Sequence, residues 1–367
     1  MELFDAHMHF APSHGEAAFD AIRAAAHIKR CTLQCIAQYG IVSTVPAALR
    51  YKAAHNLKCP GSVYVMGGLE RSAYVLCSGD ALAQSLAAQA KALLAAGCDG
   101  IKLLEGKPDI RRNFPIPDFD APEWEPFWCY AEQARVPVTL HLNDPEEFWD
   151  ASKLNPYAKS EGWFYGPETI NNEEQYRQMD AVLARHPQLA LQLAHFYFFS
   201  AQLPRLTALL RAYPNVRIDL TPGIELYTNL AQNLSAAREF FAEFGTRILY
   251  GSDIGSRAGI ANPPRAIDPD ESLARVAVIR TFLESTGAYT LIPDGKYLFR
   301  IEPTPMQGLG LSADALAAIY GGNALAFYDK KAPAPVDENA VQHLADSFAQ
   351  GVRAVQAKGL FPDAVFS

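Results

Sequence analysis

Eight short apolar segments, nearly all separated by stretches of helical composition, constrain the fold of this chain more than any other feature. The segments are 3–10, 41–45, 62–69, 100–105, 136–141, 189–195, 216–220 and 247–253. Uniformly apolar strands that alternate with helices are typical of a parallel sheet covered on both faces. The sequence therefore predicts an α/β fold, and eight such units over about 250 residues favour a (β/α)8 TIM barrel. A doubly wound open sheet is the alternative; it is disfavoured because no glycine-rich turn follows the first segment.

The segments between the strands are expected to be helices. The ranges are 16–38, 46–56, 80–96, 123–135, 172–186, 201–213 and 235–244, followed by 269–285, 312–320 and 338–358. A long polar and aromatic loop, 143–169, interrupts the alternation, and loops of this size are usually functional lids or interaction surfaces. We expect the barrel to span residues 1–328. A linker and helix at 329–367 are expected to pack on it as a C-terminal helical extension.

Composition limits the class of partner. The chain has 367 residues and a net charge of −8. This acidic balance argues against nucleic acid or an anionic membrane as a partner, because both require a basic face. The sequence has neither the pattern of a signal peptide nor an apolar run long enough to span a membrane. We therefore expect neither nucleic acid nor a membrane as a partner.

The six cysteines are scattered and form no C-x-x-C motif. In a chain of this length they are expected to be buried free thiols of a reducing compartment, which favours a cytoplasmic protein. Cys31 and Cys35 are expected on one helix, four residues apart, where they would pack rather than bind metal.

The first apolar segment carries a pair of histidines, His7 and His9. Successive side chains of a strand point to opposite faces, so both imidazoles lie on one side, with Asp5 beside them. Two imidazoles in this arrangement can chelate one cation. The alternative is two structural histidines, each bonded to a backbone carbonyl. Asp5 lies one pleat deeper, and we expect it to orient the ligands rather than to bind metal.

Polar residues also lie toward the ends of other apolar segments. They are Lys102, His141, His195 and Asp253, on the fourth, fifth, sixth and eighth segments. In a barrel these ends meet at one mouth, where barrel active sites lie. Imidazole and carboxylate groups suit Zn²⁺, and also Fe or Mn. A metal there would lower the pKa of a bound water to about 7 and give a hydroxide nucleophile. Asp253 could accept its proton and pass it to the leaving group.

As a set, these residues resemble the amidohydrolase superfamily. The opening D-A-H-M-H resembles its amidohydrolase-related (type 2) branch, as do A-H at 194–195, L-Y-G-S-D at 249–253 and Y-G-G-N-A at 320–324. That branch contains hydrolases and also non-oxidative decarboxylases. The resemblance covers about residues 1–328.

The resemblance implies a role for each of these residues. His7, His9 and His141 would hold a divalent metal, most simply Zn²⁺, and Asp253 would be the last ligand and the proton shuttle. His195 would orient the water or the substrate carbonyl, or bind a second metal. Lys102 stands where binuclear members carry a carboxylated lysine that bridges two metals. Many mononuclear members also have a lysine there, so we expect one metal and leave the second open.

Substrate binding is expected from four side chains that follow other strands: Arg71, Asn143, Glu225 and Arg257. Either arginine could clamp a substrate carboxylate through two hydrogen bonds. For any one of the four, a solvated loop position or a structural contact is the more frequent role. Many members of the branch have His-Pro shortly after the lysine that corresponds to Lys102, whereas this chain has L-E-G-K at 104–107. The substrates of those members are therefore not carried over to this chain.

Three functions follow from these observations. The leading one is a metal-dependent hydrolase that cleaves an amide, lactone or related bond of a small molecule, which could carry a carboxylate. The second is a metal-dependent decarboxylase on the same scaffold. The third is a non-catalytic barrel with a structural or sensory metal, disfavoured because structural zinc sites are closed whereas these ligands lie at an open mouth. A homodimer is also expected, because such an assembly is usual in this family.

Overall fold

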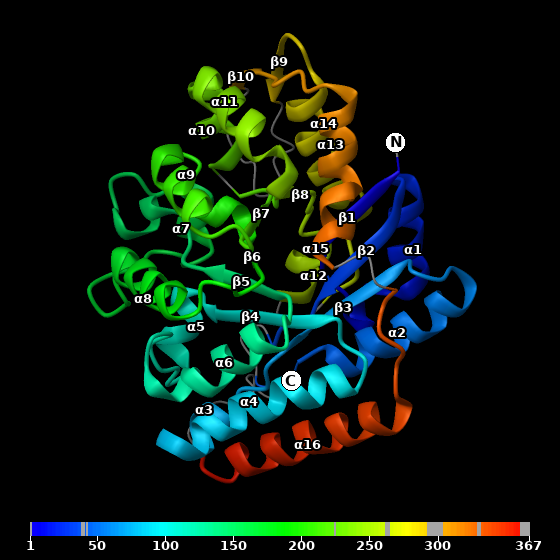
Figure 1. Ribbon diagram of the computed structural model, residues 1–367, viewed down its shortest axis with the longest axis vertical. Helices are drawn as coiled ribbons and strands as arrows, with labels where there is room; N and C mark the ends of the chain where they lie inside the picture. Colours follow the sequence, from blue (N-terminus) through cyan, green and yellow to red (C-terminus); the bar gives the residue numbers. More distant parts are fainter. Residues whose placement is uncertain are drawn as a thin grey trace.

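The computed structural model describes residues 2–37, 41, 43–223, 225–260, 265–291, 304–328 and 332–359. Eight parallel strands form one sheet and follow one another in chain order (Figure 1). The strands are β1 (Leu3–Met8), β2 (Ile28–Gln34), β3 (Val63–Gly68), β4 (Gly100–Gly106), β5 (Val138–Leu142), β6 (Leu191–Leu193), β7 (Arg217–Asp219) and β8 (Ile248–Leu249). The sheet nearly closes on itself with helices between its strands, which confirms the predicted (β/α)8 barrel.

Backbone hydrogen bonds close the barrel between β1 and the segment after β8. The amide of Asp253 donates to the carbonyl of His7 at 2.7 Å, and the amide of His9 donates to the carbonyl of Ile254 at 2.8 Å. Met8 and Ile254 form a parallel bridge. The hydrogen bonds that close the sheet therefore also fix the spacing of His7, His9 and Asp253.

Helices form the outer layer of the barrel. The longer ones are α1 (Glu16–Ala25), α2 (Val45–Lys58), α4 (Gly79–Ala95), α6 (Glu125–Gln133), α8 (Asn172–Arg185), α9 (Leu203–Ala212), α10 (Leu226–Gln232), α11 (Leu234–Phe244), α13 (Pro269–Glu284) and α16 (Glu338–Gln356). The shorter ones are α3 (Ser72–Leu76), α5 (Pro108–Asn113), α7 (Pro156–Ser160), α12 (Ser256–Ile260), α14 (Ala313–Ala317) and α15 (Asn323–Phe327). Two strands outside the barrel, β9 (Ala288–Leu291) and β10 (Thr304–Gln307), pair antiparallel. No helix in the described ranges has both the length and the hydrophobicity needed to cross a bilayer.

The prediction for the second strand is wrong. The segment predicted as one helix at 16–38 contains both α1 and β2, and the predicted strand at 41–45 overlaps the first residue of α2. Residue 42 and residues 38–40 lie outside the described part of the chain. No glycine marks the boundary between α1 and β2 in the alanine-rich sequence, because His27, with φ 57°, makes the left-handed turn that glycine usually makes.

This shift also corrects the expectation for two cysteines. Cys31 lies in β2 and Cys35 directly follows it, so neither is on a helix. Both thiols are buried in the core. All six cysteines are free, but the prediction that all are buried is wrong, because Cys59 is exposed and Cys77 and Cys129 are partly exposed.

The C-terminal helix α16 packs against α2, α3 and α4 on the outside of the barrel (Figure 1). The chain that leads to it is attached through Asp99, whose Oδ1 accepts a hydrogen bond from the amide of Ala334 at 2.7 Å. The other oxygen of Asp99 accepts from Lys52 Nζ at 2.6 Å and from the amide of Val65 at 2.8 Å. One buried ion pair therefore joins α2, β3 and the C-terminal linker.

We predict that Lys52→Met lowers the free energy of unfolding by about 3–5 kcal/mol, because it leaves the buried Asp99 carboxylate without its cation. Denaturant unfolding followed by circular dichroism measures this. The matched control is Lys29→Met, since Lys29 forms an exposed pair with Glu2 and exposed pairs contribute little. Equal effects of the two substitutions would contradict the role given to the buried pair.

Candidate metal centre

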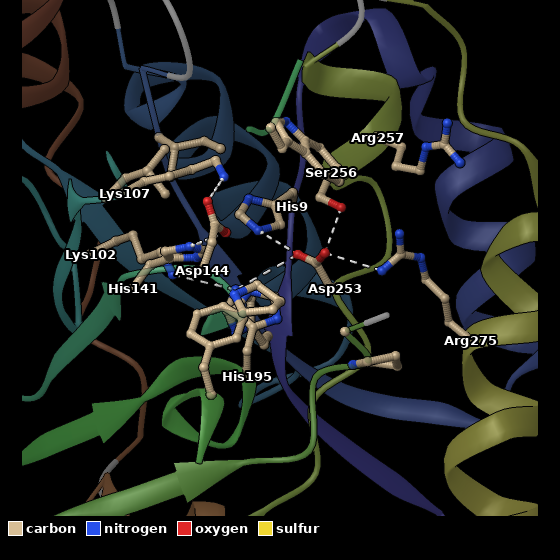
Figure 2. Close-up of a pocket in the computed structure, with 18 of the residues that line it drawn as sticks. His9, Lys102, Lys107, His141, Asp144, His195, Asp253, Ser256, Arg257 and Arg275 are labelled. Carbon is tan, nitrogen blue, oxygen red and sulfur yellow. Dashed lines mark hydrogen bonds and ion pairs between the residues drawn. The ribbon is translucent and has the colours of Figure 1, made fainter. Parts of the chain in front are cut away.

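Three predicted ligands lie together at the mouth of the barrel, where the C-terminal ends of the strands meet. His9 Nε2 is 3.1 Å from Asp253 Oδ1 (Figure 2), and His7 Nε2 is 3.9 Å from the same oxygen. One ligand atom from each of the three residues lies within 4.8 Å of the other two. Two ligand atoms of a tetrahedral zinc site, each about 2.0–2.1 Å from the ion, are separated by about 3.3 Å. The two contacts to Asp253 bracket this separation, so the set fits a divalent cation.

The buried carboxylate of Asp219 fixes the orientation of His7. Its Oδ2 accepts a hydrogen bond from His7 Nδ1 at 2.9 Å and one from Gln192 Nε2 at 2.8 Å. With a proton on Nδ1, the lone pair of His7 Nε2 faces the mouth, where Lys102 Nζ lies 3.4 Å from it. A carboxylate that holds the distal nitrogen of a histidine in this way is a recurrent feature of metal ligands.

Burial keeps the His7 imidazole neutral. Burial, together with the positive charge of Lys102, lowers the pKa of His7 to about 4. The Nζ of Lys102 lies 3.4 Å from His7 Nε2, and burial lowers the pKa of this lysine to about 8. A neutral imidazole is the form that binds metal. The structure thus brings Lys102 next to His7.

His195 and His141 line the same cavity next to the three ligands. The ring of His195 lies 5.7 Å from that of His7 and 4.8 Å from that of His141, centroid to centroid. His195 Nδ1 is buried and has no hydrogen-bond partner among the described residues, and burial holds the pKa of this imidazole well below its usual value. His141 Nε2 is 3.5 Å from Asp144 Oδ1. His195 therefore lies beside His7 and His141 beside His195, but neither belongs to the group whose ligand atoms lie within 4.8 Å of one another.

The segment after β6 places His195 through an unusual backbone. Residues 195–198 all have φ between 55° and 58°. L-amino acids adopt this left-handed conformation singly and rarely in succession, at a cost of roughly 1–2 kcal/mol each. The amide of His195 donates to Asp219 Oδ1 at 2.9 Å. The same carboxylate that orients His7 therefore also holds the start of this turn.

The second oxygen of Asp253 is occupied by protein donors. Asp253 Oδ2 accepts from Ser256 Oγ at 2.7 Å and from Arg275 Nη1 at 3.1 Å (Figure 2). Burial alone would raise the pKa of this carboxyl, but the hydrogen bond with His9 and the charge of Arg275 hold the pKa well below its usual value. Asp253 is therefore ionised, with Oδ1 directed to the histidines and Oδ2 held in place.

Asp5 lies beneath the ligands, as predicted from the pleat. Its Oδ1 accepts from the amide of His7 at 3.0 Å and from the amide of Ser252 at 3.1 Å. Burial raises the pKa of its carboxyl to about 7. Asp5 thus connects the two chain segments that carry His7 and Asp253.

Of the four predicted substrate residues, Arg257 alone is among the residues that line the cavity. Arg71 is buried with its Nε 3.9 Å from Glu105 Oε1, and its guanidinium lies over the ring of Phe114. Asn143 is buried between Asn172 and Gln175, to which its amide is hydrogen-bonded. As the side chains stand, a molecule in the cavity does not reach Arg71 or Asn143.

Glu225 lies near the edge of the cavity without lining it. A Cβ added to Gly223, which does line the cavity, would lie 2.8 Å from Glu225 Oε2. Both carboxylate oxygens of Glu225 are buried without a hydrogen-bond partner among the described residues, and burial raises the pKa of this carboxyl to about 8.

The long loop after β5 supplies the aromatic wall of the cavity. Phe148 and Trp163 stack with their ring centroids 5.8 Å apart, and Lys107 lies over Trp163. Lys107 and Tyr165 both donate to the carboxylate of Asp144. The cavity encloses about 770 Å³ including space open to solvent.

Asp219 and Arg275 are the main residues that the sequence prediction missed. Asp219 ends β7, so the rule that identified His141 and Asp253, an ionisable residue at the end of a barrel strand, could have found it. Arg275 lies on α13, far from any strand end, and no sequence signal marks it.

The comparisons with known proteins agree with this geometry. Residues 69–330 match the family model Amidohydro_2, described as amidohydrolase. This match covers more than half of the chain but not His7 or His9. No curated protein sequence matches the chain.

Solved structures with the same fold include both hydrolases and decarboxylases by name. An uncharacterised TIM-barrel protein from Bordetella bronchiseptica aligns with a TM-score of 0.53 and 15% identity, over 90% of this chain and 100% of that chain. The 2,6-dihydroxybenzoate decarboxylase from Rhizobium aligns with a TM-score of 0.50 and 15% identity, over 90% and 99%. A probable 2-pyrone-4,6-dicarboxylic acid hydrolase from Acinetobacter baumannii aligns with a TM-score of 0.50 and 12% identity, over 90% and 100%. At these identities the similarity concerns the fold alone.

We predict that Asp219→Asn weakens metal binding at the mouth by about 10–100-fold, because the neutral amide no longer holds the His7 imidazole as a carboxylate does. Titration of the metal-free protein against a chelator of known affinity measures the change. Asp150→Asn, a substitution on the exposed surface of the long loop, is the control and should leave the affinity unchanged. Unaltered affinity in Asp219→Asn would contradict the orienting role.

Proposed function

Because the chain belongs to the amidohydrolase family, we propose that it is a metal-dependent hydrolase that cleaves an amide, lactone or related bond of a small molecule. The observation that carries the proposal is the ionised carboxylate of Asp253, which lies at once against His7 and His9 and opposite His195 at the cavity. Hydrolysis requires a base next to the attacking water and a group that stabilises the carbonyl oxygen. Asp253 and His195 are the candidates for these two tasks.

His7, His9, His141 and Asp253 are the proposed ligands of one divalent cation, most simply Zn²⁺. When bound, such an ion activates water and polarises a carbonyl group. Lys102, next to His7, would contribute positive charge to the transition state. Carboxylation of Lys102 and a second cation are the alternative for this position.

The protein residues would move the proton. Asp253 would accept the proton of the attacking water, while Ser256 and Arg275 hold its Oδ2 and so fix the carboxylate plane. The same carboxyl then delivers the proton to the leaving group. His195 Nδ1 has no protein partner among the described residues, so it can orient the substrate or water by a hydrogen bond.

The cavity chemistry favours a substrate that combines a flat apolar part with a carboxylate. Three aromatic rings line it, those of Phe148, Trp163 and Phe198. The guanidinium groups of Arg257 and Arg275 line it as well. Arg275 Nη2 is buried with no hydrogen-bond partner in the described part of the chain, and a buried donor of this kind is costly unless an acceptor arrives.

The same features support a decarboxylase as the second candidate. Aromatic walls and two arginines also suit an aromatic acid, and the decarboxylase from Rhizobium shares the fold. In that reaction Asp253 or a histidine would protonate the carbon that loses CO₂. The identity of the product distinguishes the two candidates.

Asp253→Asn is expected to lower turnover by about 10²–10⁴-fold, the usual contribution of a general acid–base group. A panel of amides, lactones and hydroxybenzoates should be assayed for hydrolysis and, separately, for CO₂ release. Hydrolysis that disappears in Asp253→Asn supports the proposal. Release of CO₂ without hydrolysis would replace it with the decarboxylase, and full activity of Asp253→Asn would contradict both.

Arg257→Gln should raise KM for a carboxylated substrate by about 10–100-fold, since a hydrogen bond to a charged group contributes about 1.5–3 kcal/mol. KM for an uncharged analogue should change little. The exposed Arg112 does not line the cavity, so Arg112→Gln is the matched control. An equal rise in KM for both substrates would contradict carboxylate binding by Arg257.

A further inference from the structure

A second group of metal-ligating side chains lies on the outside of the barrel, between α6 and the C-terminal end of α8. Glu125 Oε1 is 3.2 Å from His186 Nε2 and 3.6 Å from Cys129 Sγ. The three ligand atoms lie within 4.8 Å of one another. None of the three residues lines the catalytic cavity, so this group is separate from the candidate metal centre.

His186 is held in the orientation of a metal ligand. Its Nδ1 lies 3.1 Å from Glu132 Oε2, which repeats the arrangement of Asp219 and His7 at the mouth. The side chain of His186 is 5% exposed. Its Nε2 is buried and forms no hydrogen bond of acceptable geometry with the described residues, although it faces the carboxylate of Glu125. A buried nitrogen in this position is suited to a cation.

Two of the three separations match those of a tetrahedral zinc site. Bonds of about 2.0–2.1 Å to nitrogen and oxygen and about 2.3 Å to sulfur separate N from O by about 3.3 Å and S from O by about 3.5 Å. The structure has 3.2 Å and 3.6 Å for these two separations. Glu125 and Cys129 are four residues apart on α6 and so share one face of the helix.

We propose that Glu125, Cys129 and His186 bind a thiophilic divalent cation of the Zn²⁺ class, with Glu132 as the positioning residue for His186. Arg185 Nε lies 3.3 Å from Glu125 Oε2, so it holds the oxygen that does not face the site. Binding exchanges the proton of the Cys129 thiol for a metal–sulfur bond and releases that proton to solvent. The fourth coordination position is taken by water.

Such a cation would cross-link α6 to the chain that leads from α8 into β6. The cluster joins residues about 60 positions apart in the sequence, so the bound ion would act as a stabilising clip on the outer helices. Its loss would leave the ligands at the mouth intact, which separates its effects from those of the catalytic metal.

Titration of the metal-free full-length protein with Co²⁺ tests the proposal, because thiolate coordination gives a near-ultraviolet charge-transfer band that histidine and carboxylate ligands do not give. Among the described residues, no cysteine lines the cavity at the mouth. Wild-type protein should show the band, and Cys129→Ser and His186→Gln should lose it while keeping the wild-type circular dichroism spectrum. Glu132→Gln should retain the band with about 10–100-fold weaker Co²⁺ affinity.

Cys59→Ser is the matched control, because Cys59 is the exposed thiol and should contribute nothing to the band. Zinc content should fall by one equivalent from wild type to Cys129→Ser. Absence of the band in the wild type, or its persistence in Cys129→Ser, would overturn the proposal.

Discussion

The mouth of the barrel depends on the hydrogen bonds accepted by one buried carboxylate, that of Asp219. It ends β7 and binds His7 from β1, Gln192 from β6 and the backbone at His195. A buried anion is costly without partners, and burial alone would raise the pKa of this carboxyl. The interaction with His7 and the other donors outweighs burial and holds the pKa below its usual value. Removing this carboxylate would therefore disturb the imidazole of His7 and the left-handed turn that begins at His195 together.

The sequence predicts the barrel because seven of its eight strands are bounded by residues of clear helical or turn preference. It fails at β2, where His27 takes a left-handed turn without a glycine and an alanine-rich run continues into the strand. The strand-end rule locates His141, His195 and Asp253 because parallel strands bring their C-terminal ends to one mouth. The rule cannot locate Arg275, because this residue reaches Asp253 from a helix. It also does not distinguish the two predicted arginines: Arg257 lines the cavity, whereas Arg71 is buried beside Glu105. Such differences arise from the packing of whole helices and loops.

A common arrangement links the two proposed cation sites on this chain. In each, a carboxylate holds Nδ1 of a histidine and leaves Nε2 facing a second acidic group, through Asp219 and His7 at the mouth and through Glu132 and His186 outside. The outer site includes the thiol of Cys129, which is a softer ligand than the imidazole and carboxylate groups proposed at the mouth. The outer site should therefore favour Zn²⁺ and related thiophilic ions, whereas the mouth accepts a wider set of divalent cations.

The position and number of metal ions in the Cys129→Ser protein, purified without chelator, test most directly whether His7, His9 and Asp253 bind a cation. X-ray diffraction at the absorption edge of the metal gives the position, and elemental analysis gives the count. We expect one ion at the mouth, within bonding distance of His7, His9 and Asp253. A count near two, with both ions at the mouth, would make Lys102 a bridging ligand. Less than about one equivalent of metal, with no anomalous peak among these residues, would show that they do not bind a cation.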